Sequence, residues 1–413
     1  MTDTQQLPKK EQSLSRVPRS GSDGSRNALV HILSDLGKNG IFLALIVVVV
    51  LFQFLTDGVL LRPQNISNLI VQNGYILILA MGMVMLIVAG HIDLSVGSMA
   101  AFIGAVSGVF AVNMGLPWWL AIILSLLVGA LAGAWQGFWI AYVDIPSFIV
   151  TLAGMLIFRG LALVVLGNSN IGSFPVEYRA IGNGFLTDLL GEYEVDPVTM
   201  GIAVIAILAL VVTQTRARHA RQSYGQDVEP VAWFISKLVL VSVGVLFLAY
   251  ALATFKGLPI TLILLAILVL AYGVIMKSTP FGRYIYAIGG NLHAAELSGV
   301  KTKNVSFWLF VNMGVLTAIA GLVFTARLNL AGPKAGDGFE LEAIAAAFVG
   351  GAAIHGGVGT IAGGIIGGLI IGVLNNGMSI MGIGIEWQQA VKGLVLLLAV
   401  AFDVFNKRRS GGH

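Results

Sequence analysis

Long apolar stretches separated by short polar segments make up most of this chain. Several stretches approach the roughly 20 residues that a helix needs to cross a bilayer. The stretch at 341–354 is short and also fits a re-entrant or broken helix, whose backbone must be covered by protein or line a water-filled cavity. The pattern predicts an all-α polytopic membrane protein. The expected crossings lie at about 41–56, 66–89, 97–114, 118–142, 147–166, 198–213, 233–254, 259–277, 305–326, 341–354, 358–376 and 387–405.

Composition supports the same class and excludes several functions. Of 413 residues, 57% are hydrophobic and only 11% are charged, against roughly 25% charged in soluble domains. Alternating strands that would indicate a membrane barrel are not seen. Cysteine is absent, which excludes thiol chemistry and disulfides. The net charge of +4 sits in tails and loops, so it does not indicate nucleic-acid binding.

The chain begins with a polar segment that differs from everything after it. Residues 1–38 are rich in Ser, Gly and basic side chains and contain too few apolar residues to form a core. We expect a disordered cytoplasmic tail, followed by one transmembrane domain over 39–408. The late apolar run without a small-residue cleavage site does not resemble a secretory signal.

The basic residues predict the orientation, because cytoplasmic loops carry an excess of Lys and Arg. With the N-terminus in the cytoplasm, most basic residues fall in the inner loops and tails. The expected topology is therefore multi-pass, with both termini and segment 278–304 in the cytoplasm. The outer side then receives only Arg62, Arg179, Lys256, Arg327 and Lys334.

Two parts of the sequence resemble each other. Residues 65–67 (NIS) match 304–306 (NVS), and AAFIG at 100–104 resembles AAFVG at 346–350. The first copy begins outside and the second inside, which indicates inverted repeats, a plan that places a transport pathway at the repeat interface. We expect repeat one over about 65–167 and repeat two over about 304–405, with extra crossings inserted near 195–257.

Polar residues inside predicted crossings are costly in lipid and therefore informative. They are expected to line or support a substrate pathway, although hydrogen bonding between helices explains the amides equally well. Arg159 either snorkels to a membrane surface or acts as a cavity or gate partner, and Lys392 pairs either with an acid such as Glu386 or with another interior partner. Asp93 differs from the others, because it lies between two crossings in a Gly- and Ser-flanked break. The pathway candidates are Asn73, Asp93, Gln136, Arg159, Asn312 and Asn375.

The segment 278–304 is polar between two apolar blocks, and it has two interpretations. It is either an ordinary loop or the part by which a soluble partner moves the membrane domain. Arg283, His293 and Glu296 lie within it, with Gly289-Gly290 at its centre, where we expect the glycines to let the chain turn.

Missing motifs exclude other mechanisms. No GxxxxGK[ST] is present, so this chain is not expected to bind ATP through a P-loop. Neither HExxH nor GxSxG nor a suitable carboxylate pair occurs. We therefore do not expect a membrane enzyme, and we expect no cofactor and no metal.

Five ordered runs carry a family resemblance over about residues 40–408. They are GHIDLSVGSMAAFIGAVSG, IPSFIVTLAGMLIFRG, FGRYIYAIGGNLHAAELSGVK, FELEAIAAAFVGGAAIHGGVGT and LNNGMSIMG. With these runs the chain resembles the permease subunit of bacterial monosaccharide-uptake ABC transporters, the family of the ribose, xylose and galactose permeases. It is most similar to xylose and multiple-monosaccharide permeases.

The resemblance implies a type II ABC importer with a ten-helix core, to which two crossings have been added here. It implies two permease copies, two cytoplasmic ATP-binding subunits and a periplasmic sugar-binding protein, importing a sugar of the xylose, galactose, arabinose or glucose type. Segment 278–304 then contains a coupling helix, with Tyr284, Tyr286 and Leu297 suited to docking. The ATPase-coupling residues expected by resemblance are Phe281, Gly282, Arg283, Tyr284, Gly289, Gly290, Glu296, Leu297 and Gly299.

Two other classes stay open. An ion-coupled secondary sugar transporter would use the same inverted repeats, and a membrane scaffold or receptor would show no transport. The sequence does not name the sugar, because the binding protein selects it first.

Overall fold

The computed structural model describes residues 40–410 except 168, 188–192 and 227. Side chains of 402–410 and the predicted tail over 1–38 lie outside the described part. The helices are α2 (Gly40–Leu55), α3 (Pro63–Val88), α4 (Val96–Gly108), the π-helix η1 (Val109–Asn113), α5 (Trp118–Ala141), α6 (Ser147–Leu166), α7 (Val176–Asn183), α8 (Pro197–Ser223), α9 (Val231–Ala253), α10 (Ile260–Ser278), α11 (Pro280–Gly290), α12 (Leu292–Leu297), α13 (Thr302–Leu328), α14 (Phe339–Val349), α15 (Ile361–Ile380) and α16 (Ile385–Ser410).

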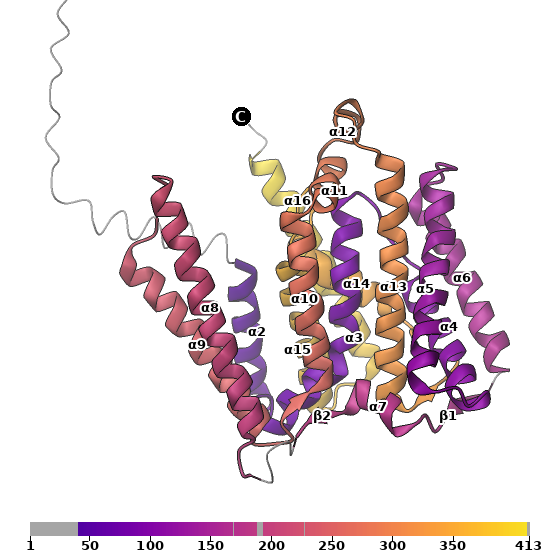
Figure 1. The fold of residues 1–413 in the computed structure, drawn as a ribbon, viewed down its shortest axis with the longest axis horizontal. Coiled ribbons are helices and arrows are strands. Elements are labelled where there is room, and N and C mark those ends of the chain that lie inside the picture. The colour runs from indigo at the N-terminus through magenta and orange to yellow at the C-terminus, as the bar shows by residue number, and fades with distance from the viewer. Residues whose placement is uncertain (1–39, 168, 188–192, 227, 411–413) are drawn as a thin grey trace, which may run out of the picture. The chain divides into compact units, whose positions relative to one another are not determined.

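Strands are confined to two short antiparallel pairs in the described residues. β1 (Ile171–Gly172) pairs with β4 (Leu330–Ala331), and β2 (Phe185–Leu186) pairs with β3 (Leu258–Pro259). Each pair joins two connections between helices at the same end of the domain (Figure 1). The remainder is helical, as the apolar pattern predicts.

Nine of the described helices are long and apolar enough to cross a membrane. This confirms a polytopic helical membrane protein, whereas the count of twelve crossings stays a prediction. α14 has 11 residues, which at about 1.5 Å per residue reach roughly half of a 30 Å hydrocarbon core. It is therefore too short to cross alone, and it matches the broken-helix alternative for 341–354.

α3 is the central helix of the domain. Buried side chains fill 89% of its apolar window, and α9, α10, α13, α14 and α15 all pack against it. α13 packs against α3, α4, α5 and α7, and α5 and α6 complete the far side (Figure 1). The core therefore consists of side chains shared between α3 and α13, such as Met81, Met85, Met313 and Leu316.

The residues that we expect to be inserted form a helical hairpin of α8 and α9, which pack mainly against each other. Asp196 begins α8, because its carboxylate accepts hydrogen bonds from the backbone N–H groups of Val198 and Thr199 at 3.2 and 3.0 Å. Burial in α9 concentrates at its C-terminal end, where Ala251 and Leu252 pack against Ile66 and Ile70 of α3. Elsewhere both helices are mostly exposed and are suited to contact lipid.

The arginine-rich segment at 216–222 (RARHARQ) is helical. It forms the last turns of α8, and the chain reverses only after Ser223 and before α9 begins at Val231. The helix continues because Arg, Ala and Gln all have high helix propensity.

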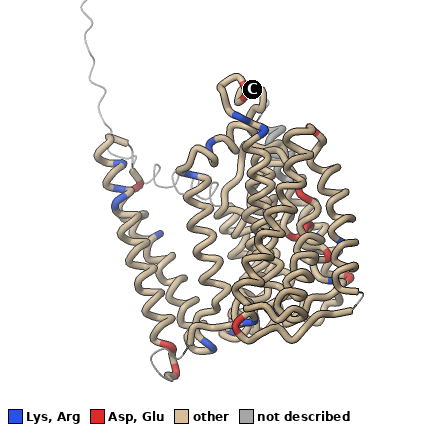
Figure 2. Tube along the Cα trace, turned by 45° about the vertical axis from the view of Figure 1, so that its right-hand side comes forward, with Lys and Arg blue, Asp and Glu red and all other residues tan. Residues whose placement is uncertain are grey.

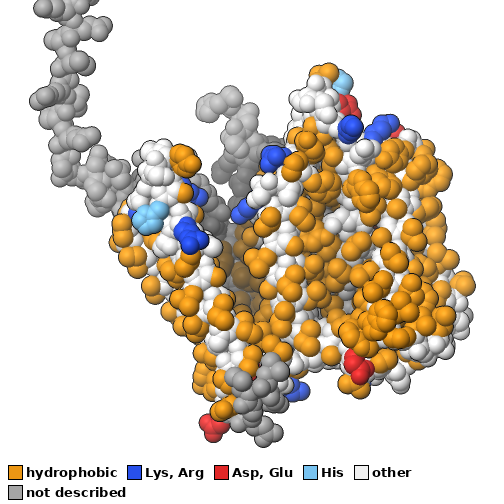
Figure 3. All heavy atoms as spheres, viewed as in Figure 1, with side chains coloured by type: hydrophobic (Ala, Val, Ile, Leu, Met, Phe, Trp, Pro, Cys, Tyr) orange, Lys and Arg blue, Asp and Glu red, His pale blue; other side chains and the backbone are white. Residues whose placement is uncertain are grey.

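Charged residues gather at the ends of the helices. Figure 2 shows many Lys and Arg residues at the end of the domain where α11 and α12 lie. Figure 3 shows that the face of the domain in view is covered mainly by hydrophobic side chains between the two ends. An apolar belt between polar ends is the surface expected of a membrane-spanning domain.

Candidate functional site

The segment between α10 and α13 folds into two short helices with clear sequence signals. Thr279 caps α11, since its hydroxyl accepts a hydrogen bond from the Gly282 N–H at 3.3 Å, and Pro280 occupies the first helical position. Asn291 caps α12 by accepting from the Ala294 N–H at 2.9 Å. Gly299 follows α12 with φ +85, a conformation that favours glycine. The segment is thus an ordered pair of consecutive short helices.

α11 has an inner and an outer face. Ile285 and Ile288 are buried in the main core. Tyr286 also turns inward, because its hydroxyl donates to the Gly359 carbonyl at 2.7 Å, and burial raises its pKa. Tyr286 is therefore half-buried, and its suitability for docking stays a prediction.

The outer face carries exposed apolar side chains. Leu297 on α12 is 81% exposed and Tyr284 on α11 is 41% exposed. A hollow of about 340 Å³ lies beside them, lined in part by Tyr284, Lys301 and Trp308. Exposed apolar groups at a polar end of the domain, beside a hollow, are features of a protein-binding surface.

The structure divides the nine expected coupling residues between these two faces. Gly282 is buried, and Phe281 and Gly289 are half-buried. The exposed members are Arg283, Tyr284, Gly290, Glu296, Leu297 and Gly299.

Gly289 and Gly290 do not provide the turn that the sequence suggests. Both belong to α11, and neither has a positive φ. A Cβ at Gly289 would overlap the Val88 carbonyl oxygen at the end of α3 and lie 2.5 Å from the Gly357 nitrogen, whereas one at Gly290 would meet nothing within 4 Å. Glycine at 289 therefore permits close packing, and the structure assigns no such role to Gly290.

Asp93 and Gln136 come together through Ser95 in the extended connection before α4. Asp93 Oδ1 accepts hydrogen bonds from the Ser95 backbone N–H at 2.8 Å and its hydroxyl at 2.7 Å. Gln136 Nε2 on α5 donates to the Ser95 hydroxyl at 2.6 Å. Asp93 Oδ2 and Gln136 Oε1 are buried without a partner among the described residues. Such unsatisfied oxygens are costly, and each can accept a hydrogen bond from a donor such as water or a hydroxyl group.

Arg159 holds the connection that precedes α14. Its guanidinium lies 2.6 Å from Asp337 Oδ1 and donates to the carbonyls of Pro333 and Ala335 at 3.1 and 2.7 Å. This planar donor group thus has several partners in one connection, which supports an interaction within the protein for Arg159.

The two connections meet where the short helices α4 and α14 begin. A Cβ at Gly97 would overlap the Gly336 carbonyl oxygen, and a Cβ at Gly336 would overlap that of Gly97. Only glycine permits this approach of two backbones. The starts of α4 and α14 therefore lie against each other inside the domain.

Glu342 forms a second polar cluster, which the sequence does not reveal. Its carboxylate accepts from Tyr75 on α3 at 3.0 Å, from Asn375 on α15 at 3.2 Å and from Lys392 on α16 at 2.8 Å. Lys392 thus pairs with Glu342, and not with Glu386. The one signal for this cluster in the sequence is Glu342 itself, an acidic residue inside a short apolar helix. An ionisable group in that position needs a partner.

Asn73 and Asn312 lie outside both clusters. Asn73 donates to the Leu69 carbonyl of its own helix at 2.7 Å and packs against Gly372 of α15. Asn312 accepts from the Tyr272 hydroxyl at 2.5 Å. These contacts join helices, and the assignment of either residue to a pathway stays a prediction.

The clusters contain carboxylate, amide, hydroxyl and guanidinium groups, which can bind the hydroxyl groups of a small polar solute. No group of three or more potential metal ligands occurs in the described part of the chain. The arrangement is that of a helical membrane domain with polar groups at its centre, which is the architecture of a permease.

Comparison with known proteins assigns the family. A family model described as a branched-chain amino acid transport system / permease component matches residues 65–227 and 178–400. The chain belongs to this permease family.

Named relatives cover nearly the whole chain. The xylose transport system permease protein XylH of Escherichia coli is 40% identical over 89% of this chain and 91% of its own length. XylH of Haemophilus influenzae is also 40% identical, over 96% of its length. The ribose import permease protein RbsC of Bacillus subtilis is 33% identical over 91% of this chain and 95% of its own. No solved structure matches.

Proposed function

We propose that this chain is the permease subunit of an ATP-driven importer that moves monosaccharides of the xylose, galactose, arabinose or glucose type across the bacterial inner membrane. The observation that carries the proposal is 40% identity to a xylose permease over 89% of the chain. A ribose permease that is 33% identical over a similar length extends the support from one sugar to a class of sugars.

The architecture that we propose is a type II permease with inverted repeats over 65–167 and 304–405. Reciprocal packing supports it. α3 packs against α14 and α15, and α13 packs against α4 and α5. In each half, a long first helix is followed by a short second one. The hairpin α8–α9 is the insertion into a ten-helix core.

We propose that both termini and the α11–α12 segment face the cytoplasm. The end of the domain with α11 and α12 carries Lys277, Arg283, Lys301 and Lys303, and Figure 2 shows this concentration of basic residues. The excess is what the positive-inside rule requires of a cytoplasmic side. The opposite end then faces the periplasmic sugar-binding protein.

The sugar pathway that we propose passes the starts of α4 and α14. Asp93 approaches this region from the connection before α4, and Gln136 and Arg159 approach it from α5 and α6. The unsatisfied oxygens of Asp93 and Gln136 are ready acceptors for sugar hydroxyls. We include Asn375 in the proposed pathway because it donates a hydrogen bond to Glu342. Asn73 and Asn312 would then support the surrounding helices.

A separate ATP-binding subunit drives the cycle in this proposal, and a second permease copy completes the importer. The ATPase docks on the outer face of α11 and α12, covering Leu297 and Tyr284. Its movements reach α3 through Gly289, where the two backbones touch. No chemical step on the sugar is required.

The test compares two residues of equal exposure at the same end of the domain. Leu297 and Tyr224 are 81% and 82% exposed, so Leu297→Asp and Tyr224→Asp should both fold. The charge buried against the ATPase in Leu297→Asp should abolish sugar uptake and weaken ATPase co-purification at least about tenfold. Tyr224→Asp should keep both. The measurements are the uptake of labelled xylose and the ratio of ATPase to permease in purified complexes.

Three outcomes would contradict the proposal. Normal uptake by Leu297→Asp would show that the α11–α12 segment is only a connection between α10 and α13. Uptake that persists without any ATPase but stops with a protonophore would favour an ion-coupled carrier. The absence of uptake of every monosaccharide tested, with all partners present, would favour a scaffold or receptor.

A further inference from the structure

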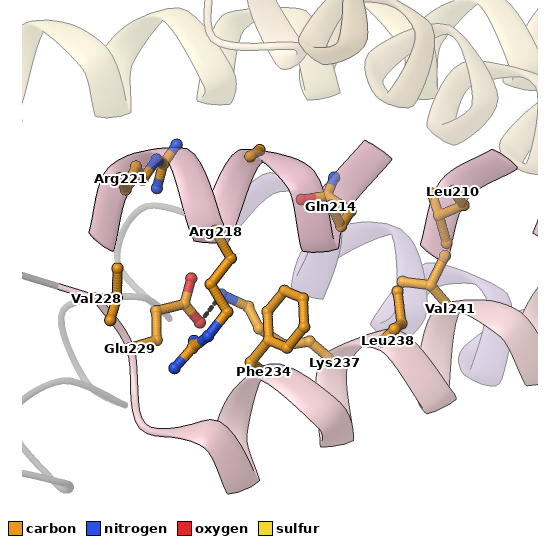
Figure 4. A pocket seen from close by; sticks show the side chains of 11 residues that line it. Leu210, Gln214, Arg218, Arg221, Val228, Glu229, Phe234, Lys237, Leu238 and Val241 are labelled. Carbon is orange, nitrogen blue, oxygen red and sulfur yellow. Dashed lines mark hydrogen bonds and ion pairs between the residues drawn. The ribbon is translucent and has the colours of Figure 1, made fainter. Parts of the chain in front are cut away.

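A pocket of about 320 Å³ lies between α8 and α9, at the end of the hairpin where the two helices are joined (Figure 4). Its walls are of two kinds. Leu210, Leu238 and Val241 form an apolar part, and Arg218 and Arg221 bring positive charge from the last turns of α8. It lies far along the sequence from the predicted sugar pathway and shares no residue with it.

The positive charge of this pocket is not neutralised within it. Lys237 lies 2.8 Å from Glu229, so this lysine is already paired. Arg218 lies over the ring of Phe234 at 5.0 Å, and stacking leaves the edge of a guanidinium free to donate hydrogen bonds. Among the described residues, neither Arg218 nor Arg221 forms an ion pair. Figure 4 shows Arg218 reaching between the two helices while Arg221 lies against α8, so the two arginines line the pocket from different positions. Guanidinium groups are suited to bind a phosphate.

The surroundings of the pocket indicate that this phosphate belongs to a lipid. Immediately before the arginines, α8 is apolar and exposed, with Leu208 58% and Val212 43% exposed, and Val239 on α9 is 54% exposed. In a membrane these side chains contact acyl chains, which places the arginines at the level of the headgroups. Basic pockets between helices at this level bind anionic headgroups.

We propose that the pocket binds the phosphate of an anionic phospholipid, whose acyl chains lie along the exposed apolar sides of α8 and α9. Arg218 and Arg221 bind the phosphate, and Leu238 and Val241 contact the glycerol and the first methylenes. Such a lipid fastens this end of the hairpin, which packs mainly against itself and meets α3 at the other end.

The experiment measures lipid binding by the purified full-length chain with native mass spectrometry. A short-chain phosphatidylglycerol is titrated against phosphatidylcholine of equal chain length. Wild-type protein should retain phosphatidylglycerol preferentially. Arg218→Gln/Arg221→Gln should lose that preference, with affinity reduced about tenfold or more, since each basic group contributes on this scale. Arg221→Gln alone should lose part of it, and because Arg221 is exposed this variant keeps the hairpin packing.

Arg216→Gln is the matched control, because Arg216 lies on the same helix and is exposed but does not line the pocket. It should bind phosphatidylglycerol within about twofold of wild type. Equal losses in Arg216→Gln and the double variant would reduce the effect to general surface charge. Unchanged binding in the double variant would overturn the proposal. Displacement of the lipid by inorganic phosphate at equal concentration would assign the pocket to free phosphate.

Discussion

α3 and α9 are almost equally hydrophobic, yet one is the centre of the domain and the other is its edge. Their mean hydropathy values are 2.0 and 2.3, whereas 89% of the α3 window and 0% of the α9 window are buried. In water such similar helices would both be driven inside. In lipid, apolar side chains gain little by leaving the acyl chains, so hydropathy decides whether a helix crosses and not where it packs.

Small and polar residues account for the difference. In α3, a Cβ at Gly82 would overlap the Met313 sulfur of α13, and one at Gly74 would lie 2.5 Å from Thr261 of α10. In α9, a Cβ at Gly244 would meet nothing within 4 Å. Close approach of backbones provides van der Waals contact that lipid does not match. Glycines that touch a neighbour therefore mark the inner helices.

The largest expected effect contrasts two glycines. A Cβ at Gly133 of α5 would overlap the Phe310 carbonyl of α13, whereas Gly244 of α9 faces open space. Gly133→Ala should lower the free energy of unfolding by about 3 kcal/mol, because rigid backbone must move. Gly244→Ala should be neutral or slightly stabilising, since alanine is the better helix former. Unfolding in detergent mixtures measures both. Equal changes in the free energy of unfolding in the two variants would contradict the contrast between inner and outer glycines.

A smaller effect is expected from two leucines. Leu79 of α3 is 0% exposed and Leu240 of α9 is 65% exposed. Leu79→Ala should cost about 2–3 kcal/mol, because it leaves a cavity among rigid neighbours. Leu240→Ala should stay within about 0.5 kcal/mol, because lipid chains fill the space. Thermal unfolding of each variant in nanodiscs provides the measurement. A large loss in Leu240→Ala would indicate that α9 packs against another protein.

The smallest effect concerns hydrogen bonds. Asn65 of α3 and Asn376 of α15 exchange two side-chain hydrogen bonds at 2.8 and 3.1 Å. A double-mutant cycle with Asn65→Ala and Asn376→Ala should show a coupling energy of about 0.6–1 kcal/mol. Thr213 of α8 bonds only to carbonyls of its own helix, so Thr213→Val should be neutral. A coupling energy near zero would leave the amide pair without a part in joining the two helices.

Most of the helices could be predicted from the sequence, because crossing a bilayer imposes length and apolarity on each one locally. The limits of α5 and α6 agree with expectation within a residue or two. The sequence also places Asp93 in a Gly- and Ser-flanked break between helices. Its contact with Gln136 through Ser95 depends on how α4 and α5 pack, which no local pattern encodes.

Two errors show why local reasoning ended there. Glu386 lies six residues from Lys392, and helix residues so spaced point to different sides, so the partner had to come from elsewhere and is Glu342. Gly289 resembles a turn residue in the sequence. Glycine is required there because the backbones of Val88 and Gly357, both distant in sequence, leave no space for a Cβ. Side-chain partners across helices and backbone contacts are properties of the packed domain.

The contact at Gly289 also has a mechanical consequence. Gly357 N–H donates to the Val88 carbonyl at 2.8 Å, and Gly289 rests on both groups. Three backbone segments thus touch with no flexible side chain between them. Rotamer changes cannot relieve these contacts, so we expect a displacement of α11 to move the end of α3 and the 356–359 loop as well. A force applied at α12 would then reach the central helix through backbone contacts alone.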